Sequence, residues 1–194
     1  MEAKLFLVVL GGRIGNSHIE QHDVRWVVGN TIDDTFDQLR KEWVGLQHGL
    51  HIDTYVSIRY IDGYEISLIK SQYNKINYIK NVPKKNNLWF VNIGGYNPNC
   101  LNEMHEFGLF VAKSSSEAKT RAKQLLLLSA VNKHNDNTYA VSKSKSIDNC
   151  FCLNSIQNWS IELKLDSLKR SQSLRPDWYG YRRLDNTQQL GLQF

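Results

Sequence analysis

Short apolar runs that end at paired glycines occur twice along the chain. Residues 5–10 (LFLVVL) precede Gly11-Gly12, and residues 88–93 (LWFVNI) precede Gly94-Gly95. Runs of this length, rich in branched and aromatic side chains, indicate buried strands, and the glycines indicate a tight turn after each. The pattern therefore predicts that the chain starts the same piece of structure twice.

The segments that follow continue the likeness. Residues 24–28 and 107–111 each predict a second strand. Beyond them, Thr31 and Ser114 each stand three positions before an acid, which is typical of a helix start where hydroxyl and carboxylate satisfy otherwise unpaired amide groups. Apolar residues at helical spacing come next in both halves. Each half is thus expected to contain two strands and then a helix.

The second half of the sequence matches the first when each residue is aligned with the one 83 positions later. Such an internal repeat indicates a fold built from repeated units. The same register holds through two glycines, two histidines and two acids, so we interpret the chain as a tandem duplication. The matched pairs that carry this interpretation are Gly11 with Gly94, Glu20 with Glu103, His22 with His105, His51 with His134, and Asp53 with Asp136.

A hairpin is expected after each helix. Residues 55–60 and 64–68 flank Asp62-Gly63, a pair that tolerates the positive φ angles of a hairpin turn. In the second half Ile147-Asp148 matches Ile61-Asp62 at an offset of 86, and residues 159–165 predict an extra strand. The fold prediction is α+β: two pseudo-symmetric strand–strand–helix–hairpin repeats with antiparallel-rich sheets, a covalently fused dimer with a ligand groove between its halves.

The predicted division of the chain has four parts. These are repeat copy one (residues 1–69), a lysine-rich linker (70–87), repeat copy two (88–165) and a C-terminal extension (166–194). The linker holds five lysines and no acid, which accounts for the whole formal charge of +5. Such a segment is typically a solvated connection.

Composition places the protein inside the cell. The three cysteines cannot all pair with one another, which argues against a disulfide framework and for a reduced, cytoplasmic setting. The longest apolar runs, 5–10 and 125–128, fall far short of the ~20 residues that cross a bilayer, and the N-terminus does not resemble a secretory signal. No membrane partner is expected.

Two polar pairs in each copy are the candidate chemistry. In an extended segment, residues two apart point to the same side, so each pair presents a carboxylate and an imidazole together. If the two pairs of a copy converge, the cluster suits a divalent ion such as zinc, manganese or iron, or general acid and base groups. A hydrogen bond that only fixes a loop is the competing interpretation, and we favour a structural or partner-contact role over catalysis or metal binding. The candidate residues are Glu20, His22, Asp23, His51 and Asp53 in copy one and Glu103, His105, His134 and Asp136 in copy two.

Several spaced motifs of copy one resemble a bacterial family catalogued as domain of unknown function 1543, found as one or two copies per chain. The resemblance implies an α+β repeat unit and a bacterial origin, and it implies no particular activity. It rests on Gly11-Gly12, residues 20–24 (EQHDV), residues 27–29 (VVG), Trp43, residues 51–53 (HID) and residues 62–64 (DGY).

Three functions remain open from the sequence. The leading hypothesis is an intracellular module that binds an unidentified ligand or protein in the groove between the copies, because no familiar hydrolase or nucleotide-binding motif is found. The alternative is a metal-dependent or acid–base enzyme that uses the Glu/His/His/Asp cluster. The third is nucleic-acid binding through the lysine-rich linker and the aromatic and basic residues 175–183, although we favour the interpretation that the rings of this segment pack on the domain surface.

Overall fold

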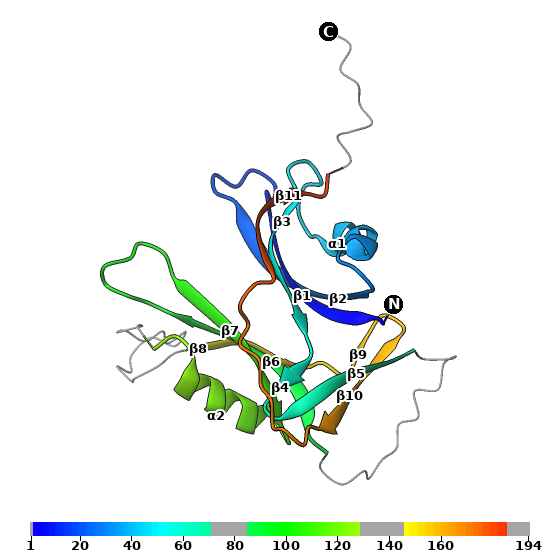
Figure 1. Cartoon of the computed structure of the whole chain (residues 1–194). Helices are drawn as coiled ribbons and strands as arrows, with labels where there is room; N and C mark the ends of the chain where they lie inside the picture. Colours follow the sequence, from blue (N-terminus) through cyan, green and yellow to red (C-terminus); the bar gives the residue numbers. More distant parts are fainter. Residues whose placement is uncertain (1, 71–84, 129–145, 186–194) are drawn as a thin grey trace.

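The computed structural model describes residues 2–70, 85–128 and 146–185. Most of the predicted linker, and the candidate residues His134 and Asp136, lie outside these ranges. Three antiparallel sheets and two short helices make up the described part, so the α+β class is confirmed (Figure 1).

The three sheets divide between the copies. Sheet A, in the order β11-β3-β1-β2, belongs to copy one and the extension; sheet C, in the order β7-β6-β8, belongs to copy two. Sheet B, in the order β4-β5-β10-β9, takes two strands from each copy. The bounds are β1 Lys4–Gly12, β2 Gln21–Gly29, β3 His51–Ile58, β4 Tyr60–Ile61, β5 Tyr64–Lys70, β6 Asn87–Gly95, β7 Met104–Ala112, β8 Ser146–Cys152, β9 Ser155–Ile156, β10 Trp159–Leu165 and β11 Trp178–Arg183.

Strand β1 is apolar on both faces because it separates two cores. Leu5 and Leu7 point into a cluster that both copies share, whereas Phe6, Val8 and Leu10 point toward helix α1 (Phe36–Glu42). Successive side chains of a strand alternate between faces, so a strand with a core on each side reads as a continuous apolar run. Strand β6 is built in the same way between the shared cluster and helix α2 (Ser115–Leu125).

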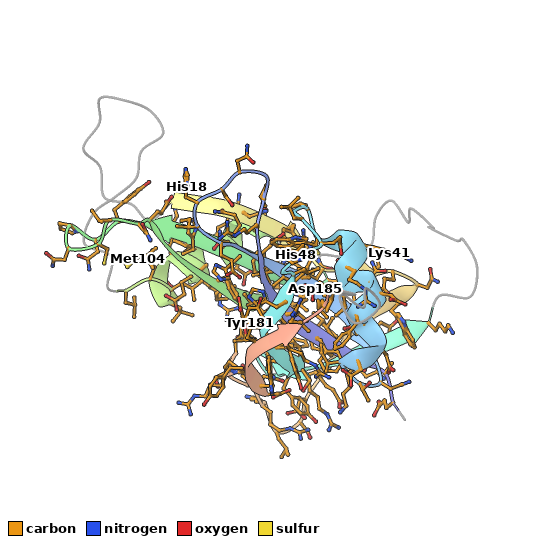
Figure 2. The ribbon with its side chains drawn as sticks, turned by 90° about the horizontal axis from the view of Figure 1, so that it is seen from above. His18, Lys41, His48, Met104, Tyr181 and Asp185 are labelled. Carbon is orange, nitrogen blue, oxygen red and sulfur yellow. The ribbon has the colours of Figure 1, made fainter. Side chains whose placement is uncertain are left out.

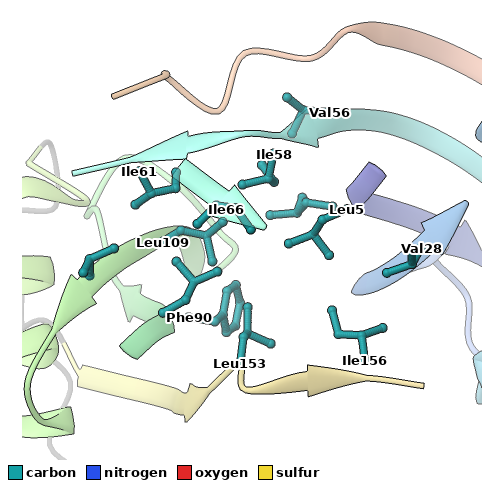
Figure 3. Packing of buried hydrophobic residues seen from close by; sticks show 13 residues of the cluster. Leu5, Val28, Val56, Ile58, Ile61, Ile66, Phe90, Leu109, Leu153 and Ile156 are labelled. Carbon is teal, nitrogen blue, oxygen red and sulfur yellow. The ribbon is translucent and has the colours of Figure 1, made fainter. Parts of the chain in front are cut away.

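The shared cluster joins the copies through buried side chains from both (Figure 3). Leu5, Ile58 and Ile66 of copy one pack with Phe90 and Leu109 of copy two. Each large apolar side chain buried in this way contributes about 1.5–3 kcal/mol. The region between the copies is therefore a packed core, and the described side chains give no support to the ligand groove expected there.

Both helices begin close to the predicted positions. At α2 (Ser115–Leu125) the Ser114 hydroxyl accepts a hydrogen bond from the Glu117 amide, and the Glu117 carboxylate accepts one from the Lys113 amide. At α1 (Phe36–Glu42) the chain first makes a 3₁₀ turn, η1 (Asp33–Thr35). There the Asp34 carboxylate accepts hydrogen bonds from the amides of Asn30 and Thr31, which lower the pKa of Asp34. The predicted hydroxyl–acid cap is confirmed at α2, whereas before α1 the acid accepts the amide groups and neither N-cap side chain accepts a capping hydrogen bond.

The first two strands of each copy keep the predicted offset of 83. Strand β1 pairs with β2 as β6 pairs with β7: Gly11 lies opposite His22, and Gly94 lies opposite His105. Glu20 and Glu103 therefore occupy equivalent positions, each one residue before the second strand of its copy.

The predicted offset is wrong for the third strand. Ile52 lies opposite Leu10 in sheet A, and Ile147 lies opposite Ile93 in sheet C, which puts Ile147 rather than Asn135 in the place of Ile52. By the same pairing Ser146 takes the place of His51, and Asp148 takes the bulge position of Asp53. Copy two has a longer connection between its helix and its third strand. The predicted matches of His51 to His134 and of Asp53 to Asp136 are therefore wrong.

The predicted match between the two hairpins is wrong for the same reason. Copy one turns at Asp62-Gly63 between β4 and β5, and copy two turns at Gln157-Asn158 between β9 and β10. The predicted match of Ile61-Asp62 to Ile147-Asp148 is therefore wrong. The segment 159–165, expected as an extra strand, forms the second strand of the copy-two hairpin, the counterpart of β5.

The C-terminal extension packs on copy one. Asp177 accepts hydrogen bonds from the amide and hydroxyl of Ser57, and β11 then pairs antiparallel with the outer edge of β3. Trp178 stacks on Tyr55 with ring centroids 5.9 Å apart. The simpler reading of the aromatic and basic tail, rings packed on the domain surface, agrees with this arrangement.

No helix in the described ranges is long and apolar enough to cross a membrane.

Candidate metal site

The candidate residues of copy one meet at one end of sheet A. Strand β1 ends there with Gly11-Gly12, while β2 and β3 begin there. Gly11 lies opposite His22 on one side and opposite His51 on the other, and Glu20 stands just before β2. Three segments therefore bring Glu20, His22, His51 and Asp53 together, which confirms for copy one the convergence that was predicted for each copy.

His51 is the centre of the cluster and is 3% exposed. Its Nδ1 atom lies 2.7 Å from the carbonyl oxygen of Gly49. A carbonyl oxygen only accepts hydrogen bonds, so Nδ1 carries the proton and Nε2 of the neutral ring is left with a lone pair. This is the arrangement by which a backbone carbonyl orients metal-binding imidazoles.

Two carboxylates face that lone pair. The Nε2 atom of His51 lies 2.7 Å from Oε1 of Glu20 and 3.1 Å from Oδ1 of Asp53. Three acceptors that converge in this way repel one another unless a cation lies among them, either a second proton on the imidazole or a metal ion.

The spacing suits a metal ion. One ligand atom from each of Glu20, His51 and Asp53 can be chosen so that all lie within 4.8 Å of one another. Nitrogen and oxygen ligands bond to transition metals at about 2.0–2.2 Å, so neighbouring ligand atoms in an octahedral or tetrahedral shell are roughly 3 Å apart. The two distances at Nε2 are close to this value.

Gly11 provides the room for the cluster. A Cβ atom on Gly11 would lie 2.6 Å from Nε2 of His51 and closer still to Oε1 of Glu20. Any other residue at this position would therefore displace both groups. The prediction of a tight turn at Gly11-Gly12 is wrong, because both glycines are paired with β2 at the end of β1. The main effect of Gly11 is to leave space beneath the converging side chains.

His22 and Glu20 form the open side of the site. The Nε2 atom of His22 lies 3.2 Å from Oδ2 of Asp53, and the His22 side chain is 58% exposed. The Glu20 side chain is 39% exposed. Burial raises the pKa of Asp53, an effect that His51 and His22 oppose. The cluster is thus anchored at a buried imidazole and open to solvent at its outer ligands.

Asp23 does not belong to the cluster. Its Oδ2 atom lies 2.5 Å from the Arg25 guanidinium, and its Oδ1 atom accepts a hydrogen bond from the Val24 amide. Arg25 in turn donates to the carbonyl oxygen of Glu42 at the end of α1. Asp23 therefore ties β2 to the helix and serves the fold.

Copy two does not repeat the cluster in the part of the chain that is described. Glu103 and His105 lie together, with 3.7 Å between Oε2 and Nε2. His134 and Asp136 lie outside the described residues, and the strand pairing puts Ser146 where copy one has His51. The residue that centres the copy-one site thus has a serine at its register position in copy two.

Three residues of the site were not predicted from the sequence as part of it. Gly49 supplies the carbonyl oxygen that orients His51, Asp185 accepts a hydrogen bond from the Gly49 amide, and the Tyr181 ring stacks on the His51 ring. Tyr181 belonged to the aromatic and basic tail that the sequence had singled out. No pattern in the sequence indicated Gly49 or Asp185.

Other motif residues serve the fold. Trp43 donates from its indole nitrogen to the Leu46 carbonyl and lies against Gly12, where a Cβ atom would meet the ring at 2.8 Å. Asp62 lies 2.8 Å from both the Val111 amide and the Arg121 guanidinium, so the copy-one hairpin holds the edge of copy two.

The basic tail has acidic partners within the molecule. Arg182 pairs with Asp33 and lies over the Phe36 ring, and Arg183 pairs with Asp185. Guanidinium groups engaged in this way are less available to a phosphate backbone. These contacts weaken the argument for nucleic-acid binding through the tail.

Comparisons with known proteins agree with the sequence resemblance. The family model described as Domain of Unknown Function (DUF1543) matches residues 17–68 and 100–163, one segment in each copy. A crystal structure of a protein Il1583 from Idiomarina loihiensis is similar, with 31% sequence identity and a TM-score of 0.67 over 94% of this chain and 99% of that one. A comparison with curated proteins finds no match. The chain belongs to the DUF1543 family and carries its domain as two tandem copies.

Proposed function

We propose that copy one binds a divalent metal ion through Glu20, His51 and Asp53, with His22 at the open side. The observation that carries the proposal is the orientation of His51. Its Nδ1 atom donates to the Gly49 carbonyl, so Nε2 points at two carboxylate oxygens. These groups lie over Gly11, which has no Cβ atom to displace them. A hydrogen bond that merely fixed a loop would not require a second carboxylate or a glycine beneath it.

The donor set favours certain metals. One imidazole and two carboxylates, without a thiolate, suit manganese(II), iron(II) or zinc(II) rather than copper(I). The partial exposure of Glu20 and His22 leaves coordination positions for water or for an oxygen donor of a ligand. A bound metal ion would acidify such a water or polarise a carbonyl or phosphoryl oxygen. The function proposed is therefore a metal-dependent ligand-binding site, with hydrolytic chemistry as the reaction class it would most readily support.

We further propose that the two copies are related by a pseudo-two-fold axis through sheet B, as in a fused dimer. Strands β5 and β10 pair antiparallel with Ser67 opposite Glu162. These two residues are also equivalents by the hairpin register, since β10 begins 95 positions after β5. A residue that pairs with its own counterpart marks the axis of an isologous contact.

Metal titration of the metal-free protein tests the proposal. Isothermal titration calorimetry with manganese(II) and zinc(II) should give one strong site per chain, and elemental analysis after dialysis should give the same stoichiometry. His51→Ala should weaken binding at least ~100-fold, because it removes the buried ligand and leaves two carboxylates unpaired.

A matched pair of variants separates this site from general metal binding. Glu20→Gln should weaken the strong site, whereas Glu103→Gln, at the equivalent position of copy two, should leave it unchanged. Thermal unfolding would establish that each variant is folded. Absence of a strong site in the wild type, or equal losses in the two glutamine variants, would favour a doubly protonated His51 that is held for structural reasons.

A further inference from the structure

We infer that the C-terminal extension positions the His51 imidazole, through Asp185 and Tyr181, so that Nε2 faces the copy-one site. This inference rests on the proposed metal site for its functional meaning. Neither residue reaches the ligand atoms, so both are positioning residues. The extension would then be a working part of the site, although it has no counterpart in the repeat itself.

Asp185 acts through the loop before β3. Its Oδ2 atom accepts a hydrogen bond from the Gly49 amide at 3.0 Å, and the Gly49 carbonyl accepts the Nδ1–H of His51 at 2.7 Å. Gly49 has a φ angle of +80°, a conformation that glycine adopts freely and that directs its two peptide groups to these partners. The chain of hydrogen bonds thus runs from the extension to the imidazole.

Asp185 is itself held firmly. Its side chain is 3% exposed, and its two oxygens accept from Nε and a terminal nitrogen of Arg183 at 2.8 and 2.7 Å. Next to it, the Leu184 amide donates to the Leu50 carbonyl, and the Leu184 side chain is buried in the copy-one core. In the view from above, Asp185 lies beside the loop that carries His48 (Figure 2). A buried, bidentate carboxylate of this kind fixes the loop more strongly than a surface contact would.

Tyr181 fixes the plane of the ring. Its ring stacks on that of His51 with centroids 3.8 Å apart and 29° between the planes, although the tyrosine itself is 62% exposed. With Nδ1 held by Gly49 and one ring face covered by Tyr181, the imidazole has a single orientation. Tyr179, two positions earlier on the same strand, is 80% exposed and provides a control for loss of an aromatic ring from β11.

The copies differ in this respect. Strand β11 pairs with the outer edge of β3, whereas sheet C, as far as it is described, ends at β8. Asp185 and Tyr181 therefore lie beside copy one, whose third strand begins with His51. The third strand of copy two begins with Ser146 at the same register position.

Nitrogen NMR of the histidine rings in the metal-free protein tests the inference directly. The wild type should show His51 in one fixed ring orientation, with a proton on Nδ1 that the Gly49 carbonyl protects from exchange with solvent. Asp185→Ala and Tyr181→Ala should make the Nδ1 proton exchange rapidly and should average the ring signals, because the ring is then free to change its orientation. Tyr181→Phe, which keeps the stacked ring, should restore the wild-type pattern, and Tyr179→Ala should leave it unchanged.

Metal affinity supplies the second readout. Asp185→Ala and Tyr181→Ala should weaken the strong site ~10–100-fold, the range found for groups that orient metal ligands, with Tyr181→Phe and Tyr179→Ala close to the wild type. Should Asp185→Ala fail to fold, the Tyr181 pair still decides. Identical ring signals in the wild type and Tyr181→Ala would overturn the inference even if the wild type binds metal. Fixed ring signals in a wild type that binds no metal would overturn the proposed function and leave the positioning intact.

Discussion

The two copies share their framework and differ at the end of their strands. In each, a strand ending in Gly-Gly pairs with a second strand in the same register, and one face joins the common core. In copy one, however, the C-terminal extension covers the edge of β3 and contacts the head of that strand, where His51 lies. Both copies have the paired strands that the common core requires, whereas the candidate site depends on the C-terminal extension, which packs on copy one.

The largest effect that distinguishes the copy-one site should come from Gly11→Ala. The new methyl group would meet Glu20 and His51 well inside contact distance, so we expect metal binding to be lost and the free energy of unfolding to fall by about 1–3 kcal/mol. Gly15→Ala is the control: open space surrounds Gly15, but its φ of +50° makes alanine cost about 1–2 kcal/mol. Calorimetric titration and urea unfolding would measure both. If Gly15→Ala also abolished metal binding, the cause would be the loss of stability and not the loss of the space that Gly11 leaves beneath Glu20 and His51.

The second effect concerns the hairpin turns, which are Asp62 in copy one and Gln157 in copy two, with φ angles of +52° and +54°. Asp62→Gly removes the acceptor of the Val111 amide and the partner of Arg121, so we expect a loss of about 1–3 kcal/mol.

Gln157→Gly is the matched variant, since glycine suits both backbone conformations and Gln157 is exposed. Its stability should stay within about 0.5 kcal/mol of the wild type. Urea unfolding of the two variants compares them directly, and equal losses would mean that the backbone, not the contact between copies, determines the cost.

A smaller effect is expected from the exposed histidines. His22→Ala removes the imidazole that contacts Asp53, so affinity should fall about 10-fold at neutral pH, as for other groups that orient metal ligands. His22 also opposes the raised pKa of Asp53, so a proton should compete better with the metal in the variant at low pH. His105→Ala, at the equivalent position, should leave affinity unchanged. The loss in His22→Ala should grow as the pH is lowered; a loss that shrinks at low pH would indicate that His22 is a direct ligand, because a protonated imidazole cannot bind metal.

The smallest effect concerns Asp166, in the turn that supports the copy-one hairpin. Its two oxygens accept hydrogen bonds from the Arg170 guanidinium and amide, which hold the pKa of Asp166 well below its usual range. A lowered pKa in the folded protein stabilises it above the unfolded pKa of about 3.9, and this stabilisation is lost as the pH falls through the folded value. Asp166→Asn should therefore lower the melting temperature at pH 7, and the difference from the wild type should shrink below about pH 4. A difference that stays constant across the pH range would exclude the ion pair as its cause.

Much of the framework could be predicted from the sequence because it follows from local pattern. The apolar runs before Gly11 and Gly94, and the hydroxyl–acid pairs before the helices, correspond to strands and helix starts in the fold. The register of the third strand could not, because it is set by pairing with the first strand across a connection whose length differs between the copies. A chance His-x-Asp match at the repeat offset was therefore misleading.

The copy-one cluster was predictable in membership but not in arrangement. Residues two apart on extended segments placed Glu20 with His22 and His51 with Asp53, and the fold brings these pairs together. Asp23 was wrongly included, because its side chain points to Arg25 on the other side of the strand. Asp185 and Gly49 could not be found, since a hydrogen bond between residues 136 positions apart leaves no local signal.

Sheet B also determines how the protein loses its structure. Its two central strands come from different copies, and the apolar cluster beside it is lined by both. Neither half can therefore melt without exposing the interior of the other, which couples the two in one thermodynamic transition. A chain that reads as two domains in sequence should denature as a single cooperative body.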